Sequence, residues 1–579
     1  MEKEKYRADI DGLRAIAIIT VIIFHYGFLP NGYLGVDIFF VISGFLITKI
    51  IFSESEKSKF SLKTFYIRRT RRIIPLVTFF SLLTLVVGIF TMLPDDLENL
   101  SQSIVATTFF SNNILQLITT GNYYDVVNEF KPLMHTWSLG IEEQFYMVYP
   151  LLFLLLKKDK TKYILPVLIA ISILSVILFL KSENAAQKFY LLQYRFFELS
   201  IGGIGAIIFR RQLLQIKFSF VFVIILLILL IFPINFISSS ILLLIVVLFT
   251  LLLLISDNNA PISAFMLKNT LFVLVGKISF SLYMWHQVVL AFGRYIFIQE
   301  MTIINIIVLS LSILILSIIT YLFIETPFRN KDFISVKKLV ILLIIISFLN
   351  IGASFYIYQK AGVLKDIPEL DISKKSAKRN MHAQYNADIY NFNKDFTDSQ
   401  NIKVLCIGNS YARDWVNVLL ESKYKNFIDL SYIYSIKEES TKQRIEKADI
   451  VFVTNISKNG IDSLQPDYSK IWCVGTKNFG VSNGIFYNNF SDDFCFQKTR
   501  MENRYYKIND SIKFIWKDKY IDIVDKISDS LGKVPVFTPD CKFISQDCRH
   551  LTEAGAKYFA TLFDHELEKI LSISQESNN

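Results

Sequence analysis

Residues 11–25 read DGLRAIAIITVIIFH, and this stretch decides how the rest of the chain is understood. Arg14 and His25 bracket ten mostly apolar residues, which places them roughly 16 Å apart along one helix. An ionisable side chain in a membrane helix is costly and usually faces a cavity or a partner. The stretch therefore predicts a membrane helix with a functional pair. A hydrogen-bonded histidine that is idle at the bilayer interface fits it equally well.

The composition separates a membrane region from a polar region. Of the 579 residues, 52% are hydrophobic and only 19% are charged, which is low for a soluble protein. The apolar character ends near residue 360. We therefore predict a polytopic α-helical membrane domain over 1–335, an extra span and polar linker over 336–400, and an α/β domain over 401–579. No small-residue cleavage pattern follows the first apolar run, so we expect that run to remain as an anchor.

A helix that crosses a bilayer needs about 20 mostly apolar residues. By this measure the sequence predicts eleven spans. They lie near 10–28, 34–52, 73–93, 141–156, 163–181, 194–209, 218–233, 238–256, 271–292, 303–324 and 338–358.

The charged loops predict the orientation of these spans. Lys and Arg collect at 68–72, 157–162, 210–217 and 329–338, whereas the alternate loops are poor in them. The positive-inside rule then places the N-terminus in the cytoplasm and residues 401–579 outside. The net charge of +10 is accordingly a topology signal, and we expect a lipid bilayer and no nucleic acid as partner.

The ends of the spans carry more clusters of polar residues than a simple membrane anchor requires. The arginines at 68–72 either only anchor the topology or bind phosphates, because arginine presents a planar donor fork. The adjacent acids Glu142 and Glu143 at the entry to a span are hard to explain by packing. The candidate residues for binding the donor or substrate are Arg14, Asp37, Arg68, Arg69, Arg71, Arg72, Trp137, Glu142, Glu143 and Tyr146.

Several of these motifs, in this order, resemble the membrane-bound acyltransferase-three family over about residues 6–330. The resemblance rests on Arg-x10-His at Arg14 and His25, Phe-Phe-Val-Ile-Ser-Gly-Phe-Leu-Ile from Phe39, the arginine cluster, Trp-Ser-Leu with Glu142 and Phe145-Tyr146, and Ser-Leu-Tyr-x-Trp-His at 281–286. The family O-acylates glycans and other extracytoplasmic acceptors, usually from acyl-CoA. The resemblance implies that His25 is the catalytic base or acyl carrier and that Arg14 supports donor binding.

The polar region reads as alternating strands and helices, which predicts a parallel sheet covered on both faces. Strands are expected at 403–407, 448–453, 471–474 and 534–537, with helices at about 413–422 and 553–571. Functional loops then gather at the carboxyl ends of the strands.

A serine directly after the first strand and an Asp-x-x-His near the end predict a nucleophile with its base. Asp547 and His550 are one helical turn apart, so both can serve Ser410. Otherwise Ser410 is only the cap of a helix. Together the motifs resemble the SGNH hydrolase-like fold, whose block usually reads Gly-Asp-Ser where this chain has Asn409. The backbone amide of Ser410 and the side chain of Asn455 are the oxyanion candidates.

All five cysteines lie in the polar region, and Cys541 and Cys548 either form a disulfide or remain two free thiols. We expect no metal and no permanently bound cofactor. The resemblance implies an O-acetyltransferase of a bacterial inner membrane, with acetyl-CoA as donor and a surface glycan or lipid-linked oligosaccharide as acceptor. Lipopolysaccharide O-antigen is favoured, and a capsular or peptidoglycan acceptor stays open. Two other classes are an extracytoplasmic carbohydrate esterase on a membrane anchor and a transporter with a glycan-binding domain.

Overall fold

The computed structural model describes residues 6–57, 59–119, 126–155, 163–297, 301–379, 381–397, 400–454, 456, 458–464, 466–489 and 493–577. The chain forms two compact units. The first, here called the membrane unit, comprises Met1–Phe90 and Leu100–Phe355. The second, here called the outer unit after the orientation that the sequence predicts, comprises Thr91–Asn99 and Tyr356–Asn579.

A short segment of the first half of the chain therefore belongs to the outer unit. Leu93 shares an apolar cluster with Phe486, Phe537 and Phe543. The side chain of Asn488 also donates a hydrogen bond of 2.9 Å to the carbonyl of Thr91. The sequence assigned this segment to the membrane domain, and the predicted boundaries at 335 and 400 stay predictions.

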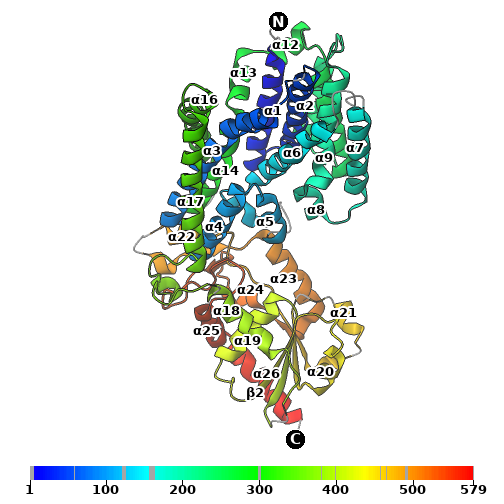
Figure 1. Ribbon diagram of the computed structural model, residues 1–579. Coiled ribbons are helices and arrows are strands. Elements are labelled where there is room, and N and C mark those ends of the chain that lie inside the picture. Colours follow the sequence, from blue (N-terminus) through cyan, green and yellow to red (C-terminus); the bar gives the residue numbers. More distant parts are fainter. Residues whose placement is uncertain are drawn as a thin grey trace. The chain divides into compact units, whose positions relative to one another are not determined.

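The membrane unit is built from helices (Figure 1). Their bounds are α1 (Ala8–His25), α2 (Gly35–Glu56), α3 (Leu62–Thr91), α4 (Pro94–Thr108), α5 (Asn112–Thr119), α6 (Thr136–Leu155), α7 (Ile164–Lys181), α8 (Ala185–Tyr190), α9 (Leu192–Ile208), α10 (Phe220–Ile231), α11 (Ser239–Ile255), α12 (Pro261–Leu267), α13 (Thr270–Lys277), α14 (Ser279–Ile296), α15 (Ile303–Thr320), α16 (Thr326–Arg329) and α17 (Val336–Gln359). Along the chain, the segment Thr91–Asn99 of the outer unit takes in the last residue of α3 and the first residues of α4, and the division at Tyr356 falls near the C-terminal end of α17.

Each predicted span coincides with a helix, or at 271–292 with the pair α13 and α14, which is bent by 68°. Within the described residues, six helical stretches are long and apolar enough to cross a membrane, or seven if the bent pair is one span. Helices α10 and α11 have only 12 and 17 residues, and α1 contains three charged side chains. The chain is thus a multi-pass membrane protein, but length and apolarity alone support fewer spans than eleven.

Glycines allow close packing in the membrane unit. A Cβ at Gly44 of α2 would lie 1.7 Å from the carbonyl oxygen of Leu199 in α9. A Cβ at Gly202 of α9 would lie 2.1 Å from the carbonyl oxygen of Val41. Small residues at such crossings let backbones approach, which is how membrane helices associate. The Ser-Gly-Phe motif around Gly44 therefore has a packing role.

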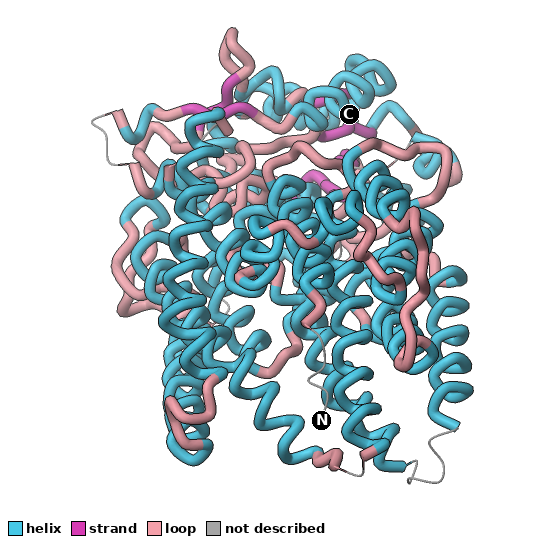
Figure 2. Tube along the Cα trace, turned by 90° about the horizontal axis from the view of Figure 1, so that it is seen from above, coloured by secondary structure: helices cyan, strands magenta, loops and turns pink. Residues whose placement is uncertain are grey.

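The outer unit contains all seven strands of the described residues (Figure 2, strands magenta). Five of them form a parallel sheet in the order β2-β1-β3-β4-β6. Their bounds are β1 (Ile402–Ile407), β2 (Ile428–Ile433), β3 (Ile450–Val453), β4 (Ile471–Val474) and β6 (Tyr520–Ile521). Helices include α18 (Met381–Ala387), α19 (Ser410–Glu421), α20 (Thr441–Lys447), α21 (Lys458–Asp462), α22 (Gly484–Tyr487), α23 (Asn503–Trp516), α24 (Ile523–Ile527), α25 (Glu553–Leu562) and α26 (Asp564–Ser577).

Both faces of the sheet are buried. Val404 and Cys406 of β1 belong to the apolar cluster that includes Trp415, whereas Leu405 and Ile407 belong to the cluster that includes Trp516. This alternation follows from the two-residue period of a strand. The predicted α/β architecture, with helices on both faces of a parallel sheet, is confirmed (Figure 1).

Three sequence predictions for this unit need correction. The strand expected at 534–537 is β7 (Lys533–Pro535), which pairs antiparallel with β5 (Lys498–Arg500) outside the main sheet. The helix expected at 553–571 is two helices, α25 and α26, separated at Phe563. Strand β2 was missed, because Asp429 and Ser431 interrupt its apolar run.

Candidate functional site

The pair that opens the sequence lies on one helix, as predicted. Helix α1 runs from Ala8 to His25 without a break. Gly12 brings α1 against its neighbour, since a Cβ there would lie 1.8 Å from the carbonyl oxygen of Leu267. Nη1 of Arg14 lies 3.3 Å from Oδ1 of Asp11, one turn earlier. The helix thus carries a cation near its start and an imidazole at its end.

A cavity in the membrane unit gathers several predicted binding residues. Arg14, Arg69 and Arg72 line it together with Glu142 and Tyr146. The remaining lining side chains are mostly apolar, as with Phe39, Phe40 and Ile73, and come from α1, α2, α3, α6 and α14. Three guanidinium groups in one apolar-walled cavity make a site for an anionic ligand with an apolar part.

The four arginines of α3 have different tasks. Arg69 and Arg72 are three residues apart and share the face that lines the cavity. Arg68 makes two hydrogen bonds with Glu54, of 2.8 and 2.9 Å. Arg71 donates to backbone carbonyls after α16, including a 2.6 Å bond to Ile334. Arg68 and Arg71 are therefore occupied by contacts that hold the protein together.

Glu142 and Glu143, both predicted to bind donor or substrate, also differ in their surroundings. Glu142 lines the cavity and accepts hydrogen bonds from Ser43 and Tyr146. Glu143 is buried, and its Oε1 has no hydrogen-bond partner in the described part of the chain.

Asp37 and Trp137 lie outside the described lining of the cavity. Asp37 is buried and pairs with Nη1 of Arg195 at 2.6 Å, and Arg195 also binds Glu198 at 2.9 Å. Trp137 packs against Phe189 with ring centroids 4.3 Å apart. A buried carboxylate requires such a partner, so these contacts give Asp37 a supporting position in the packing of α2 against α9.

A cluster of histidines that the sequence analysis did not identify as a site surrounds His25. The ring centroids of His25 and His286 are 5.0 Å apart, and those of His135 and His286 are 5.3 Å apart. Tyr283 contacts both His135 and His286, at 5.3 and 5.2 Å between centroids, and it also lines the cavity. The Ser-Leu-Tyr-x-Trp-His motif was a signal for His286 alone, because the three rings come from separate segments: α1, the turn before α6, and α14.

In the outer unit, Ser410 is the first residue of α19, directly after β1. Gly408 permits this turn, with φ of +141° and no room for a Cβ, which would lie 2.4 Å from Oγ1 of Thr454. The cap of α19 is Asn409, whose side chain accepts from the amide of Tyr411 at 3.1 Å. The capping interpretation of Ser410 is thus wrong. Asn409 replaces aspartate here without loss of the cap, since both supply an acceptor oxygen.

Asp547 and His550 form the contact that their spacing predicts. Nδ1 of His550 lies 2.6 Å from Oδ2 of Asp547, and Oδ1 accepts from the amides of Arg549 and His550 at 2.9 and 2.8 Å. Burial raises the pKa of Asp547, but the hydrogen bond and charge of His550 outweigh it and hold that pKa below its usual value. The carboxylate therefore orients the imidazole.

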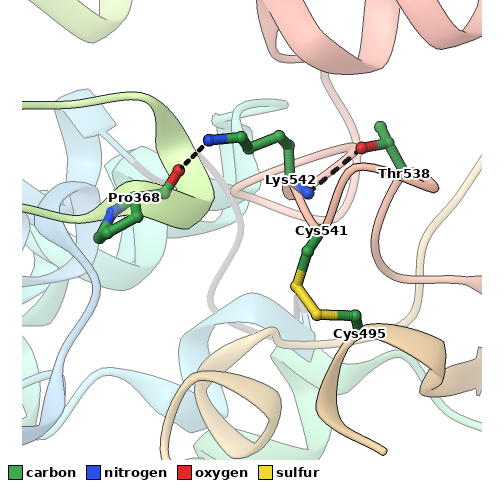
Figure 3. Close-up of a disulfide and its surroundings, with 5 residues drawn as sticks. All are labelled: Pro368, Cys495, Thr538, Cys541 and Lys542. Carbon is green, nitrogen blue, oxygen red and sulfur yellow. Dashed lines mark hydrogen bonds between the residues drawn. A yellow bond between two sulfur atoms is a disulfide. The ribbon is translucent and has the colours of Figure 1, made fainter.

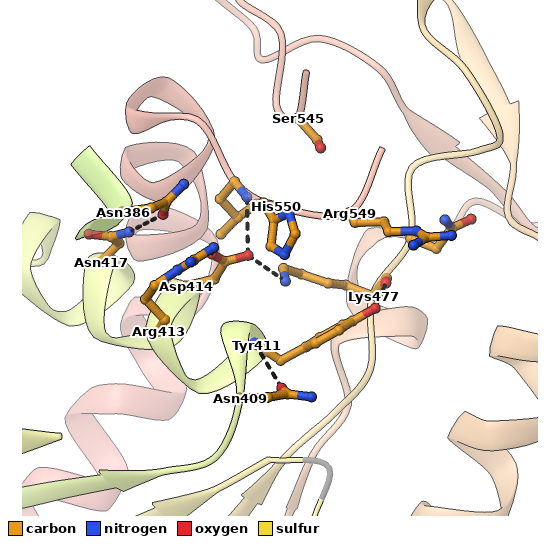
Figure 4. Close-up of polar contacts among 12 residues, drawn as sticks. Asn386, Asn409, Tyr411, Arg413, Asp414, Asn417, Lys477, Ser545, Arg549 and His550 are labelled. Atoms are coloured by element: carbon orange, nitrogen blue, oxygen red, sulfur yellow. Dashed lines mark hydrogen bonds and ion pairs between the residues drawn. The ribbon is translucent and has the colours of Figure 1, made fainter. Parts of the chain in front are cut away.

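The structure records no hydrogen bond between Ser410 and His550 among the described residues, but it joins their elements. Oδ2 of Asp414, one turn after Ser410, accepts from the amide of Leu551 at 3.1 Å. The same oxygen lies 2.6 Å from Nζ of Lys477, in the loop after β4 (Figure 4). Lys477 and Asp414 are 2% and 1% exposed, and Nζ of Lys477 lies 4.1 Å from the ring centroid of Tyr411. Sequence reasoning did not find this ion pair, whose partners are 63 residues apart.

The second oxyanion candidate, Asn455, lies outside the described residues. The part of α4 that belongs to the outer unit brings further carboxyl groups close to the Asp547–His550 pair. Burial and the carboxylates of Asp547, Asp96 and Glu98 raise the pKa of Asp95 well above its usual range.

The disulfide prediction is wrong in its pairing. Cys541 is bonded to Cys495, 46 residues away, with 5.0 Å between Cα atoms (Figure 3). The adjoining Lys542 donates from Nζ to the carbonyl of Pro368 at 2.6 Å. Cys548 is a buried free thiol, and its carbonyl accepts from Asn478 and Phe479 at 3.2 and 2.9 Å. These backbone contacts, in place of a disulfide, hold the loop that presents His550.

Comparison with known proteins gives one family and a set of relatives. A family model described as an acyltransferase domain matches residues 7–322. The provisionally named O-acetyltransferase SAR0937 of Staphylococcus aureus strain MRSA252 is 30% identical over 481 residues, which cover 74% of this chain and 78% of that protein. O-acetyltransferase OatA of Staphylococcus aureus strain NCTC 8325 / PS 47 is 30% identical over 361 residues, 58% of this chain and 59% of OatA. No solved structure matches significantly.

Proposed function

This chain belongs to the acyltransferase family whose domain it carries over residues 7–322, and we propose that it moves an acetyl group from cytoplasmic acetyl-CoA to a hydroxyl of a surface glycan. The relatives named as O-acetyltransferases support the acetyl group and the oxygen acceptor. Residues 401–579 would receive the group on the far side of an inner membrane. The basic loops support this orientation.

One observation carries the proposal: Arg14, Arg69 and Arg72 line a single, mostly apolar cavity on helices that include α1, which ends at His25. Guanidinium groups bind phosphates by paired, charge-assisted hydrogen bonds. The phosphates of coenzyme A suit the arginines, and its apolar arm suits the walls. In this arrangement His25 acts as the base or acyl carrier at the other end of α1.

The outer unit would complete the transfer. Ser410 would accept the acetyl group as an ester, with its proton passing to His550, and would then donate the group to a glycan hydroxyl. Asp547 would hold the imidazole in the required tautomer, which its 2.6 Å contact with Nδ1 supports. The backbone amide of Ser410 supplies one oxyanion donor.

The acceptor is proposed by class. Lipopolysaccharide O-antigen remains our prediction, and peptidoglycan and capsule remain alternatives, because the names of the relatives specify none of them. Mass spectrometry of each surface glycan from cells with and without this chain tests the proposal. We expect one glycan to lose acetyl groups, and unchanged acetylation in all of them would contradict the proposed activity.

An esterase is the second candidate function, and one observation favours it. The side chains of His550 and Asp547 are 31% and 44% exposed, so water has access to this pair. The full-length protein given an acetylated glycan, with and without acetyl-CoA, separates the two functions. Net gain of acetyl groups with acetyl-CoA supports the transferase, and net loss under both conditions supports the esterase.

A further inference from the structure

His286 holds its imidazole in one defined state. The ring is fully buried in α14, and Nδ1 lies 2.6 Å from the carbonyl oxygen of Tyr283. A carbonyl can only accept, so Nδ1 carries the proton and Nε2 is left with a lone pair. Nε2 is buried and has no hydrogen-bond partner in the described part of the chain. A buried acceptor without a partner is a place where a donor group from a ligand fits.

His25 is held in the same way. Its Nδ1 lies 2.8 Å from the carbonyl oxygen of Val21, one turn earlier in α1. The two rings are 5.0 Å apart between centroids at 64°, close enough for both to act on one bound molecule. His135 adds a third buried ring at 5.3 Å from His286, and neither of its nitrogens has a partner in the described residues. The cluster therefore offers more than one base.

One residue, Tyr283, links the cluster to the proposed donor cavity. Tyr283, whose carbonyl holds His286, lines that cavity, and its hydroxyl contacts Ser138 at 2.6 Å. The reactive carbonyl of a bound thioester would thus arrive next to the residue that fixes His286.

We infer that His286 is a second catalytic residue of the membrane unit, whose Nε2 binds the hydroxyl of a small alcohol that takes the acyl group from the thioester before Ser410 receives it; this rests on the proposed function. As the hydroxyl oxygen attacks the thioester carbon, its O–H bond breaks and the proton passes to Nε2. The new O–C bond forms, the C–S bond breaks, and the thiolate leaves. His286 then returns the proton to the thiolate sulfur, which leaves as the free thiol.

The test compares two nucleophiles on the full-length protein in detergent, with radiolabelled acetyl-CoA as donor. An alcohol needs a base, whereas hydroxylamine attacks thioesters without one. We expect His286→Gln to slow transfer to a small alcohol by about 100-fold or more, the usual contribution of a general base. Transfer to hydroxylamine should stay within about threefold of wild type, because Gln is close to the imidazole in size and places a polar amide near the Nε2 position without acting as a base.

Each outcome decides a different point. Wild-type alcohol transfer by His286→Gln, or equal loss with both nucleophiles, would overturn the assignment of His286 as a base. If wild type transfers acetyl to neither nucleophile, the proposed function itself fails. If the variant does not fold, the solvent deuterium isotope effect on wild type replaces it. That effect should appear with the alcohol and be absent with hydroxylamine, and no difference between the two would contradict the inference.

Discussion

The two candidate sites hold their histidines in different surroundings. In the membrane unit, His135 and His286 are 2% and 0% exposed and their rings contact each other. In the outer unit, the side chain of His550 is 31% exposed and Nδ1 is already bound to Asp547. An enclosed site protects a reactive acyl group from water. The contrast favours thioester chemistry in the closed site and final transfer to a large glycan at the open one.

The largest expected effect concerns the open site, where residues act as one unit. Ser410→Ala and His550→Ala should each lower glycan acetylation by about 10⁴-fold or more, and the double variant should be little worse. Acetylated glycan from membranes of each variant, measured by mass spectrometry, checks this. If the losses of the two single variants multiplied in the double variant, the two residues would act independently and their assignment as one catalytic unit would be wrong. Asp547→Asn should cost less, since it changes the orientation of His550 only.

His25→Ala tests the closed site. We expect a loss of about 10²- to 10⁴-fold in acetyl transfer, the range for a missing acid–base group, with unchanged protein level. The measurement is release of coenzyme A by membranes given acetyl-CoA. Ser410→Ala is the matched control, because it should still allow this first step. Full activity of His25→Ala would instead support the alternative that His25 is an idle, hydrogen-bonded histidine at the bilayer interface.

The two sites also differ in how far their contacts could be predicted from the sequence. Asp547 and His550 are three residues apart, so their contact follows from local spacing. Apolar runs predict helices because a backbone in lipid must satisfy its own hydrogen bonds. The contacts of His286 with His25 and His135 depend on how distant segments pack, and no local pattern encodes that. Likewise, Arg68 and Arg69 are adjacent in sequence, and only their different directions around α3 place Arg69 in the cavity lining and Arg68 beside Glu54.

The third prediction compares Arg72 and Arg68, two arginines that point in different directions from α3. Arg72→Lys should raise the KM for acetyl-CoA about tenfold, because a point charge replaces a bidentate fork. Arg68→Lys is the control, since Arg68 pairs with Glu54 outside the cavity lining, and its KM should stay near wild type. Steady-state kinetics on membranes measures both. Equal KM values for the two variants would show that the cavity does not bind the donor.

The smallest effect on activity is expected from the disulfide, which lies in the same unit as the Asp547–His550 pair and joins Cys541, six residues before Asp547, to Cys495. Cys495 and Cys541 close a loop with a sequence separation of 46. A cross-link over such a loop restricts the unfolded chain and typically adds about 3–4 kcal/mol. The variant Cys495→Ala/Cys541→Ala should therefore melt at a lower temperature but retain activity at 25 °C.

The control separates the observed pairing from the one that the sequence suggested. Cys548 is a buried free thiol, so Cys548→Ala removes only a small packed group and should shift the melting temperature less. Reductant should lower the melting temperature of wild type and of Cys548→Ala, and should leave the Cys495→Ala/Cys541→Ala variant unchanged. Differential scanning calorimetry of the full-length protein measures this. A Cys548→Ala variant that no longer responds to reductant would mean that Cys548 forms the disulfide, and the loop presenting His550 would then be covalently tied.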